Sequence, residues 1–177
     1  MAVVIDGTTG ISGVDGSAGI PAVQGTDTNT GIYYSAADTV DVATGGVQRG
    51  QFDSSGNFKF NSGYGSVATA YGCRAWVNFN GTGTVAIRAS GNVTSITDNG
   101  VGDYTVNFTN ALSDANYCVS TGYRNNNSNY TRMGGLTIKY NVTPTTSALR
   151  VETGYGDDNS SAYNNQDYDY CCLSIFR

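Results

Sequence analysis

The chain has 177 residues, enough for one or two small domains with a buried core. Charged residues are only 13%, with 24 glycines, 13 tyrosines, no histidine and a net charge of −5, so the composition favours strands over helices and excludes histidine-dependent catalysis. No basic cluster exists to bind nucleic-acid phosphates, and no apolar run is long enough for a signal core or a membrane span, so we expect assembly in a cytoplasm without membrane insertion.

The first segment, residues 1–26, is rich in glycine and has little apolar bulk. Because so few apolar side chains cannot form a core alone, the segment is either disordered or ordered by packing on a partner. The even spacing of its isoleucines and valines favours an extended arm that docks on a larger assembly. The candidate anchor residues are Val3, Val4, Ile5, Ile11, Val14, Ile20 and Val23.

The second segment, residues 27–62, consists of very short alternating stretches separated by turns. Gly45-Gly46 and residues 55–57 give the turn signals. Residues 57–61 alternate between polar and aromatic side chains, which predicts a strand with Phe58 and Phe60 on one face. A pair of such short strands is unstable alone, so this β neck module needs a neighbour.

The third segment, residues 63–177, shows strand patterns separated by turn signals about every ten residues. This spacing predicts an antiparallel β-sandwich in which the last strand is paired and is not a loose tail. The turn at residues 81–83 joins the first two of these strands as a hairpin. The expected strands are residues 75–80, 84–88, 91–96, 102–108, 116–119, 136–140, 148–151 and 169–176.

Residues 27–57 resemble a short module of bacteriophage tail fibres and tail spikes, which runs approximately gDTxTGIyxpaaDTvxxxtGGxxRxxiDssGN. The match rests on Asp27, residues 30–33, residues 36–39, Gly45-Gly46, Arg49 and residues 53–57. In that family the module joins a virion-anchoring segment to a distal domain. The resemblance therefore implies a protein located on the surface of a virus particle.

Residues 63–177 are also similar to the C-terminal β-sandwich of many phage fibres. The similarity is carried by residues 75–81, 102–108 and 115–119, and by the cadence YxVxFxxaxxdxxYxV that begins at Tyr104 and ends at Val119. This resemblance implies a trimeric distal knob. It assigns no binding residues to this chain.

The sequence contains no catalytic signature, and we expect no enzyme activity, no metal and no cofactor. Acids that could form a glycoside-cleaving pair or hold calcium are Glu152, Asp157, Asp158, Asp167 and Asp169. Asp157 and Asp158 stand in a Gly-Asp-Asp-Asn sequence, where aspartate caps its own backbone in a turn. We expect the cysteines to be free structural thiols, with a disulfide or a metal site as the alternative, at Cys73, Cys118, Cys171 and Cys172.

Two segments, residues 123–130 and 155–168, are rich in tyrosine and asparagine. Binding loops favour this combination, because tyrosine gives rigid contact area and asparagine gives adaptable hydrogen bonds. The alternative is that any fibre has polar loops of this kind. The candidate receptor-binding residues are Tyr123, Asn125, Asn126, Asn127, Tyr130, Tyr155 and Tyr163.

These observations predict an all-β structural fibre protein of a phage virion, built as an intertwined homotrimer. The arm would hold tail or capsid proteins, the neck would trimerise, and the β-sandwich head would contact a glycan or protein of the host surface. We favour a tail fibre over a head fibre of the capsid. The alternatives are a capsid decoration or adaptor protein that contacts no host, and a free glycan-binding or glycan-cleaving protein.

Overall fold

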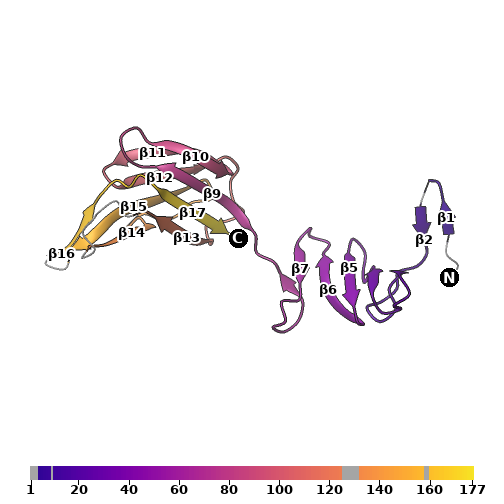
Figure 1. The fold of residues 1–177 in the computed structure, drawn as a ribbon. Coiled ribbons are helices and arrows are strands. Elements are labelled where there is room, and N and C mark those ends of the chain that lie inside the picture. Colours follow the sequence, from indigo (N-terminus) through magenta and orange to yellow (C-terminus); the bar gives the residue numbers. More distant parts are fainter. Residues whose placement is uncertain (1–3, 9, 125–131, 158–159) are drawn as a thin grey trace. The chain divides into compact units, whose positions relative to one another are not determined.

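The computed structural model describes residues 4–8, 10–124, 132–157 and 160–177 (Figure 1). All regular elements among them are β-strands in antiparallel sheets, which confirms the all-β prediction. No helix in this part of the chain is long and apolar enough to cross a membrane. The chain divides into two compact units, Met1–Ala70 and Tyr71–Arg177, and each is described by itself.

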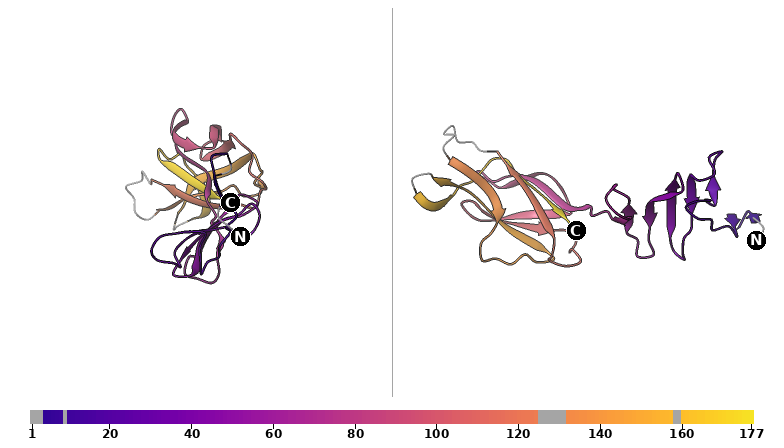
Figure 2. Two further views of the ribbon diagram at one scale, coloured as in Figure 1. Left: turned by 90° about the vertical axis from the view of Figure 1, so that its right-hand side faces the viewer. Right: turned by 90° about the horizontal axis from the view of Figure 1, so that it is seen from below.

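The first unit contains a hairpin and a six-stranded meander. β1 (Val4–Asp6) pairs with β2 (Gly10–Ser12), and Ile5 lies opposite Ile11. In the meander each strand pairs with the next one along the chain (Figure 1, Figure 2). Its strands are β3 (Val23–Gln24), β4 (Gly31–Tyr33), β5 (Val40–Thr44), β6 (Val47–Phe52), β7 (Phe58–Phe60) and β8 (Ala68–Thr69). We call this six-stranded sheet the neck sheet.

The neck sheet extends beyond the residues expected from the sequence at both ends. β3 lies within residues 1–26 and pairs with β4, and β8 lies beyond residue 62 and pairs with β7. The backbone N–H of Tyr34 also donates to the carbonyl of Asp15 at 2.8 Å. The chain from Asp15 onward is therefore tied to the sheet. The extended arm stays a prediction, and residues 4–12 of that segment contain the β1–β2 hairpin.

The Gly45-Gly46 turn between β5 and β6 is confirmed. Both glycines have positive φ, 60° and 75°, which side chains with a Cβ rarely adopt. A two-residue turn with this geometry matches the twist of the flanking strands. The glycine pair thus fixes the register of the central hairpin of the neck sheet.

The second unit contains two antiparallel sheets. The first sheet has the order β10-β9-β17-β13. The second has the order β11-β12-β15-β14, with β16 paired to the far end of β15. The strands are β9 (Cys73–Asn80), β10 (Ala86–Gly91), β11 (Val93–Gly100), β12 (Asp103–Phe108), β13 (Cys118–Tyr123), β14 (Arg132–Ile138), β15 (Ala148–Asp157), β16 (Ser160–Asn165) and β17 (Cys171–Phe176). The last strand, β17, lies between β9 and β13, so the prediction of a paired C-terminal strand is confirmed.

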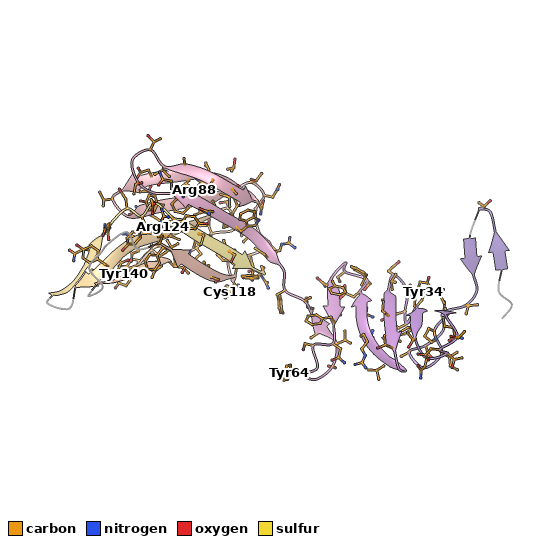
Figure 3. All side chains as sticks on the ribbon, viewed as in Figure 1. Tyr34, Tyr64, Arg88, Cys118, Arg124 and Tyr140 are labelled. Atoms are coloured by element: carbon orange, nitrogen blue, oxygen red, sulfur yellow. The ribbon has the colours of Figure 1, made fainter. Side chains whose placement is uncertain are left out.

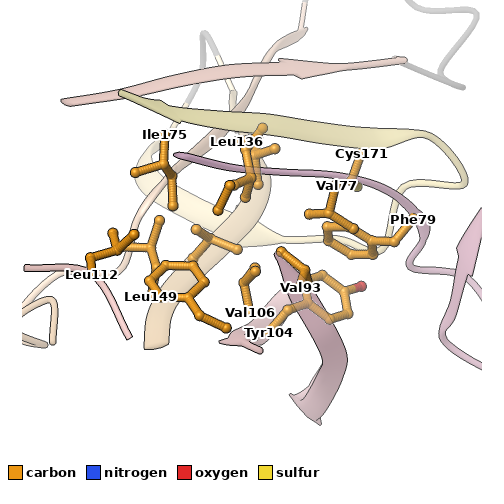
Figure 4. Close-up of a cluster of buried hydrophobic side chains, with 14 of the residues drawn as sticks. Val77, Phe79, Val93, Tyr104, Val106, Leu112, Leu136, Leu149, Cys171 and Ile175 are labelled. Carbon is orange, nitrogen blue, oxygen red and sulfur yellow. The ribbon is translucent and has the colours of Figure 1, made fainter. Parts of the chain in front are cut away.

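Both sheets supply alternate side chains to one buried cluster (Figure 4). Tyr104, Val106 and Phe108 face this cluster from β12, as their period-two spacing predicts. Residues of β9, β14, β15 and β17 also belong to it, namely Ala75, Val77, Phe79, Leu136, Leu149, Val151, Cys171, Leu173 and Ile175, and Val93, Leu112 and Tyr168 complete it. Burying each of the larger side chains contributes about 1.5–3 kcal/mol, so this cluster holds the two sheets together. The β-sandwich and the trimer expected from the sequence stay predictions.

The segment 155–168, expected to be a loop, is largely a hairpin. β15 continues to Asp157, and β16 returns alongside it from Ser160 to Asn165. β16 has the sequence SSAYNN, which lacks alternating apolar residues. Its pairing with β15 comes from the backbone ladder, and a hydrophobic pattern does not reveal such a strand.

Candidate functional site

One face of the neck sheet is apolar and uncovered. Directly paired residues of antiparallel strands lie on the same face, and Val42 is paired with Ile32, while Phe52 is paired with both Val40 and Phe58. We call this surface the neck face. It consists of Val23, Ile32, Val40, Val42, Val47, Phe52, Phe58 and Phe60, whose exposed fractions lie between 39% and 56%.

The aromatic residues of the neck face are already arranged against one another. The Phe58 ring lies 5.3 Å from the Phe52 ring, and 6.4 Å from the Phe60 ring with an interplanar angle of 7°. Phe58 also lies over Gly50, where an added Cβ would stand 3.6 Å from Cε2 of that ring. The result is an ordered aromatic strip across β6 and β7 that has no cover within the described part of this unit.

The opposite face of the neck sheet is closed by a polar network around Asp41, whose carboxylate is fully buried. Oδ2 accepts hydrogen bonds from the Ser35 hydroxyl at 2.7 Å and the Ser35 N–H at 3.1 Å. Oδ1 accepts from Nε2 of Gln51 at 2.8 Å and from Nε2 of Gln48. Burial alone would raise the pKa of Asp41, but these hydrogen bonds outweigh it and lower the pKa below 3.8. The buried carboxylate on this face therefore has its hydrogen-bond partners within the same unit.

The turn that follows β6 is organised by Asp53. Its Oδ1 accepts the N–H groups of Ser55 and Asn57 at 3.0 and 2.9 Å, and its Oδ2 pairs with Lys59 at 2.8 Å. The Lys59 ammonium, then the Asn57 N–H, hold the pKa of this carboxyl well below its usual range. The sequence Asp-Ser-Ser-Gly-Asn, part of the phage-fibre resemblance, therefore has a local structural role here.

The described candidate anchor residues are distributed over several segments of the first unit. Val4 and Ile5 belong to β1 and Ile11 to β2. Val14 is half-buried and Ile20 is 68% exposed in the connection that follows. Val23 is part of the neck face, so it belongs to the neck sheet and not to a separate arm. Val3 lies outside the described residues.

Of the candidate receptor-binding residues, Asn125, Asn126, Asn127 and Tyr130 lie outside the described residues. The Tyr123 ring packs against Tyr168 with centroids 5.1 Å apart, and its hydroxyl donates to the Gly134 carbonyl at 2.5 Å. This side chain therefore links β13 to β14. Receptor contact by these residues stays a prediction.

Tyr155 and Tyr163 stand on the β15–β16 hairpin. Tyr155 is half-buried, whereas Tyr163 is exposed and its hydroxyl lies 3.5 Å from the Gly135 carbonyl. The Tyr163 ring covers Gly154, where an added Cβ would lie 2.8 Å from Cε1 of the ring. Tyr163 is thus the described candidate that presents aromatic surface to solvent.

Three of the candidate acids have structural partners. Asp167 accepts a hydrogen bond from the Gly102 N–H at 2.7 Å and from the Tyr104 hydroxyl at 2.5 Å. Glu152 pairs with Lys139 at 2.9 Å, and Asp169 pairs with Arg124. Asp157 belongs to β15, and Asp158 lies outside the described residues.

No group of three or more candidate ligand side chains that could hold a metal ion is found within the residues described. The four cysteines are free thiols. Cys171 is buried in the core, and burial, then the nearby Cys172, raises the pKa of its thiol to about 12. That thiol is therefore protonated at neutral pH and serves as a small apolar core residue.

Sequence reasoning identified only part of the neck face. The alternation at residues 57–61 revealed Phe58 and Phe60, but the valines of β5 and β6 were not assigned to the same surface. Val40 and Val42 alternate with Asp41, which was the available signal. These valines lie on the same face as Phe58 and Phe60 only because β5, β6 and β7 pair in this register, which the structure gives and the sequence does not.

Comparison with protein-family models, curated proteins and solved structures found no match to this chain. The likeness to phage fibres accordingly stays a prediction that rests on the residues of this chain.

Proposed function

We propose that this chain is a structural fibre protein of a bacteriophage virion. It is a trimeric tail fibre, anchored by its N-terminal residues and contacting the host cell surface through its C-terminal domain. The observation that carries the proposal is the uncovered neck face, because it lies in the same segment that resembles the phage-fibre module. An exposed apolar face is stabilised when a partner covers it, so we expect a partner to bind at the neck sheet.

The energetics favour covering the neck face. Soluble monomers rarely expose a contiguous apolar patch larger than a few hundred Å². Covering one half-exposed valine or phenylalanine contributes on the order of 1 kcal/mol, so covering the eight residues of the neck face contributes several kcal/mol per copy. The polar network around Asp41 needs no partner. The asymmetry between the two faces supports association through one face only.

Another copy of the same sheet is the partner that we propose. Two apolar sheet faces pack about 10 Å apart when their side chains interdigitate. Two copies would cover the neck face as a two-layer sandwich, and three would cover it as a three-sided prism. The phage-fibre resemblance of residues 27–57 favours three.

The second unit is the proposed head, with its two sheets packed as a β-sandwich. Three heads at the end of one fibre would present three identical surfaces to a host cell. Weak contacts made by each head then add through a high effective concentration, so useful adhesion does not require a tight single site.

The native mass of the purified chain, measured by light scattering, tests the proposal. The same measurement is made on a chain that lacks residues 1–13. This deletion stops before Asp15, whose carbonyl accepts the Tyr34 N–H, and so leaves the neck sheet whole. We expect a trimer from both chains, with only the longer one incorporated into virions. Monomers from both chains would overturn the fibre and favour a decoration protein or a free glycan binder.

A further inference from the structure

The outer face of the β10-β9-β17-β13 sheet has a groove of about 380 Å³. It lies over β9, β17 and β13, on the side away from the shared core. The outward side chains that line it are Trp76, Asn78, Ser120, Cys172 and Ser174, together with Gly122. All the residues that line the groove are uncharged. Its volume is within the range of sites that hold small molecules.

The strand register explains how these residues meet. Trp76 is paired with Ser174, and Ser174 is paired with Ser120. One step along the strands, Cys172 stands between Asn78 and Gly122 in the same way. The two rows cross three adjacent strands and span about 10 Å. One large aromatic residue therefore faces a floor of small and hydroxyl-bearing residues.

Trp76 is held in place at the edge of this groove and is 43% exposed. Its indole lies against Gly91 of β10, where an added Cβ would stand 2.9 Å from Cδ1 and 3.3 Å from Cε2. Only a glycine leaves room for the ring in this position. On β13, at the other side of the groove, a Cβ on Gly122 would lie 2.9 Å from Sγ of Cys172. The absence of a side chain at Gly122 therefore leaves the groove open on this side. The indole is both ordered and accessible.

After the accessible indole of Trp76, the side chain of Asn78 is the second observation that indicates a ligand site. Its Oδ1 is buried and accepts no hydrogen bond from the residues that the structure describes. A buried polar atom without a partner is unfavourable and rare in folded proteins. Asn78 also lines the groove, so a ligand hydroxyl bound there would lie beside this amide.

We propose that this groove binds one neutral pyranose ring of a host-surface glycan. The apolar C–H face of the sugar stacks on the Trp76 indole, and its hydroxyls exchange hydrogen bonds with Asn78, Ser120 and Ser174. An apolar wall with a few convergent polar groups is the usual composition of a small-molecule site. This inference rests on the proposed function, because it names the ligand class that the head contacts.

The charge distribution favours a neutral sugar over an acidic one. Arg88 and Arg124, both labelled in Figure 3, lie over the ring of Tyr170 at 5.3 and 5.8 Å, and neither lines the groove. Arg124 is also paired with Asp169. A second copy of the chain is a poorer occupant, because packing on the groove would bury the two serine hydroxyls and leave the Asn78 amide unsatisfied.

Trp76 is the single tryptophan of the chain, so its fluorescence reports on this groove alone. The full-length protein is titrated with methyl glycosides of glucose, galactose, mannose and N-acetylglucosamine, and with methyl glucuronide as the acidic probe. We expect a saturable spectral shift with at least one neutral glycoside and none with the glucuronide. No shift with any neutral glycoside, or an equal shift with the acidic one, overturns the proposal.

Two variants keep the tryptophan and change the polar groups around it. Asn78→Val and Ser174→Ala should each weaken the titration roughly tenfold, because each removes one hydrogen-bonding group. Ser95→Ala on β11, outside the groove, should bind like the parent protein. Unchanged titration in both groove variants overturns the proposal, as does an indole shielded from a soluble quencher before any sugar is added. A trimer with an inactive groove would leave the proposed fibre intact, so the two failures are distinguishable.

Discussion

The rings of Phe52 and Phe58 lie 5.3 Å apart across β6 and β7, and both are more than 45% exposed within a single chain. Two aromatic rings held in contact on an open surface are ordered before any partner arrives. Such pre-organisation lowers the entropy cost of association, because the side chains are already in the conformation that the interface uses. The pair therefore marks the centre of the proposed contact between copies.

A charge in this pair should prevent assembly. Phe58→Glu places a carboxylate on the neck face of every copy, so association would bring three like charges together on an apolar surface. We expect the light-scattering mass to fall from that of a trimer to that of a monomer. Ser54→Glu adds the same charge in the exposed turn after β6 and should leave the trimer intact. A trimeric Phe58→Glu protein would show that the copies do not meet at this face.

The buried Asp41 carboxylate should make the neck sheet sensitive to acid. Its folded-state pKa lies below 3.8, whereas an unfolded aspartate titrates near 3.9. The stabilisation is therefore fully present above about pH 5 and is lost as the pH falls through the folded-state pKa. Asp41→Asn should lower stability at neutral pH by roughly 1–3 kcal/mol, since its amide would turn a donor toward Gln48 and Gln51.

The Asp41 prediction is checked by urea unfolding at neutral and acidic pH and at one protein concentration, because association also contributes to stability. Asp38→Asn is the matched control, since Asp38 is exposed. The parent and the control should lose stability in acid more steeply than Asp41→Asn. Parallel pH profiles for all three proteins would contradict a role for this carboxylate.

The tyrosines around β14 should tolerate no side chain at Gly134. A Cβ there would lie 2.6 Å from the Tyr168 hydroxyl and 2.8 Å from Cε2 of Tyr123, inside van der Waals contact. Gly134→Ala should therefore destabilise the second unit by about 1–3 kcal/mol, as overpacking does. Gly156→Ala, on β15, meets no atom within 4 Å and should change stability little. Thermal unfolding of the two variants checks this, and equal melting temperatures would refute the packing argument.

Strands with a strong periodic signal could be predicted, and strands without one could not. The alternation of Tyr104, Val106 and Phe108 with polar residues predicted β12, because every second side chain of this strand enters the core. β16 is polar and is held by its backbone, while β3 has only two residues, too few for a period. Local composition contains no information about such strands.

The groove, unlike the neck face, depends on pairing between distant parts of the chain. Trp76, Ser120 and Ser174 come together only because β17 inserts between β9 and β13. The sequence offered tyrosine and asparagine as a binding signal instead, and this placed Tyr123 among the candidates. In the structure the Tyr123 hydroxyl is engaged by the Gly134 carbonyl, because β13 and β14 bring the two residues together.

The buried Tyr104 hydroxyl should be a main support of the loop that carries Asp167. It lies 2.5 Å from Oδ1 of Asp167 and 3.0 Å from the Gly81 carbonyl, and burial, then the hydrogen bond to Asp167, raises the pKa of this phenol far above 10.0. Tyr104→Phe leaves the carboxylate without this donor and should cost about 1–3 kcal/mol in urea unfolding. Tyr140→Phe removes a hydroxyl from a side chain that is 78% exposed, and its effect should stay within about 0.5 kcal/mol. A Tyr104→Phe protein as stable as Tyr140→Phe would mean that Asp167 is held by the Gly102 N–H alone.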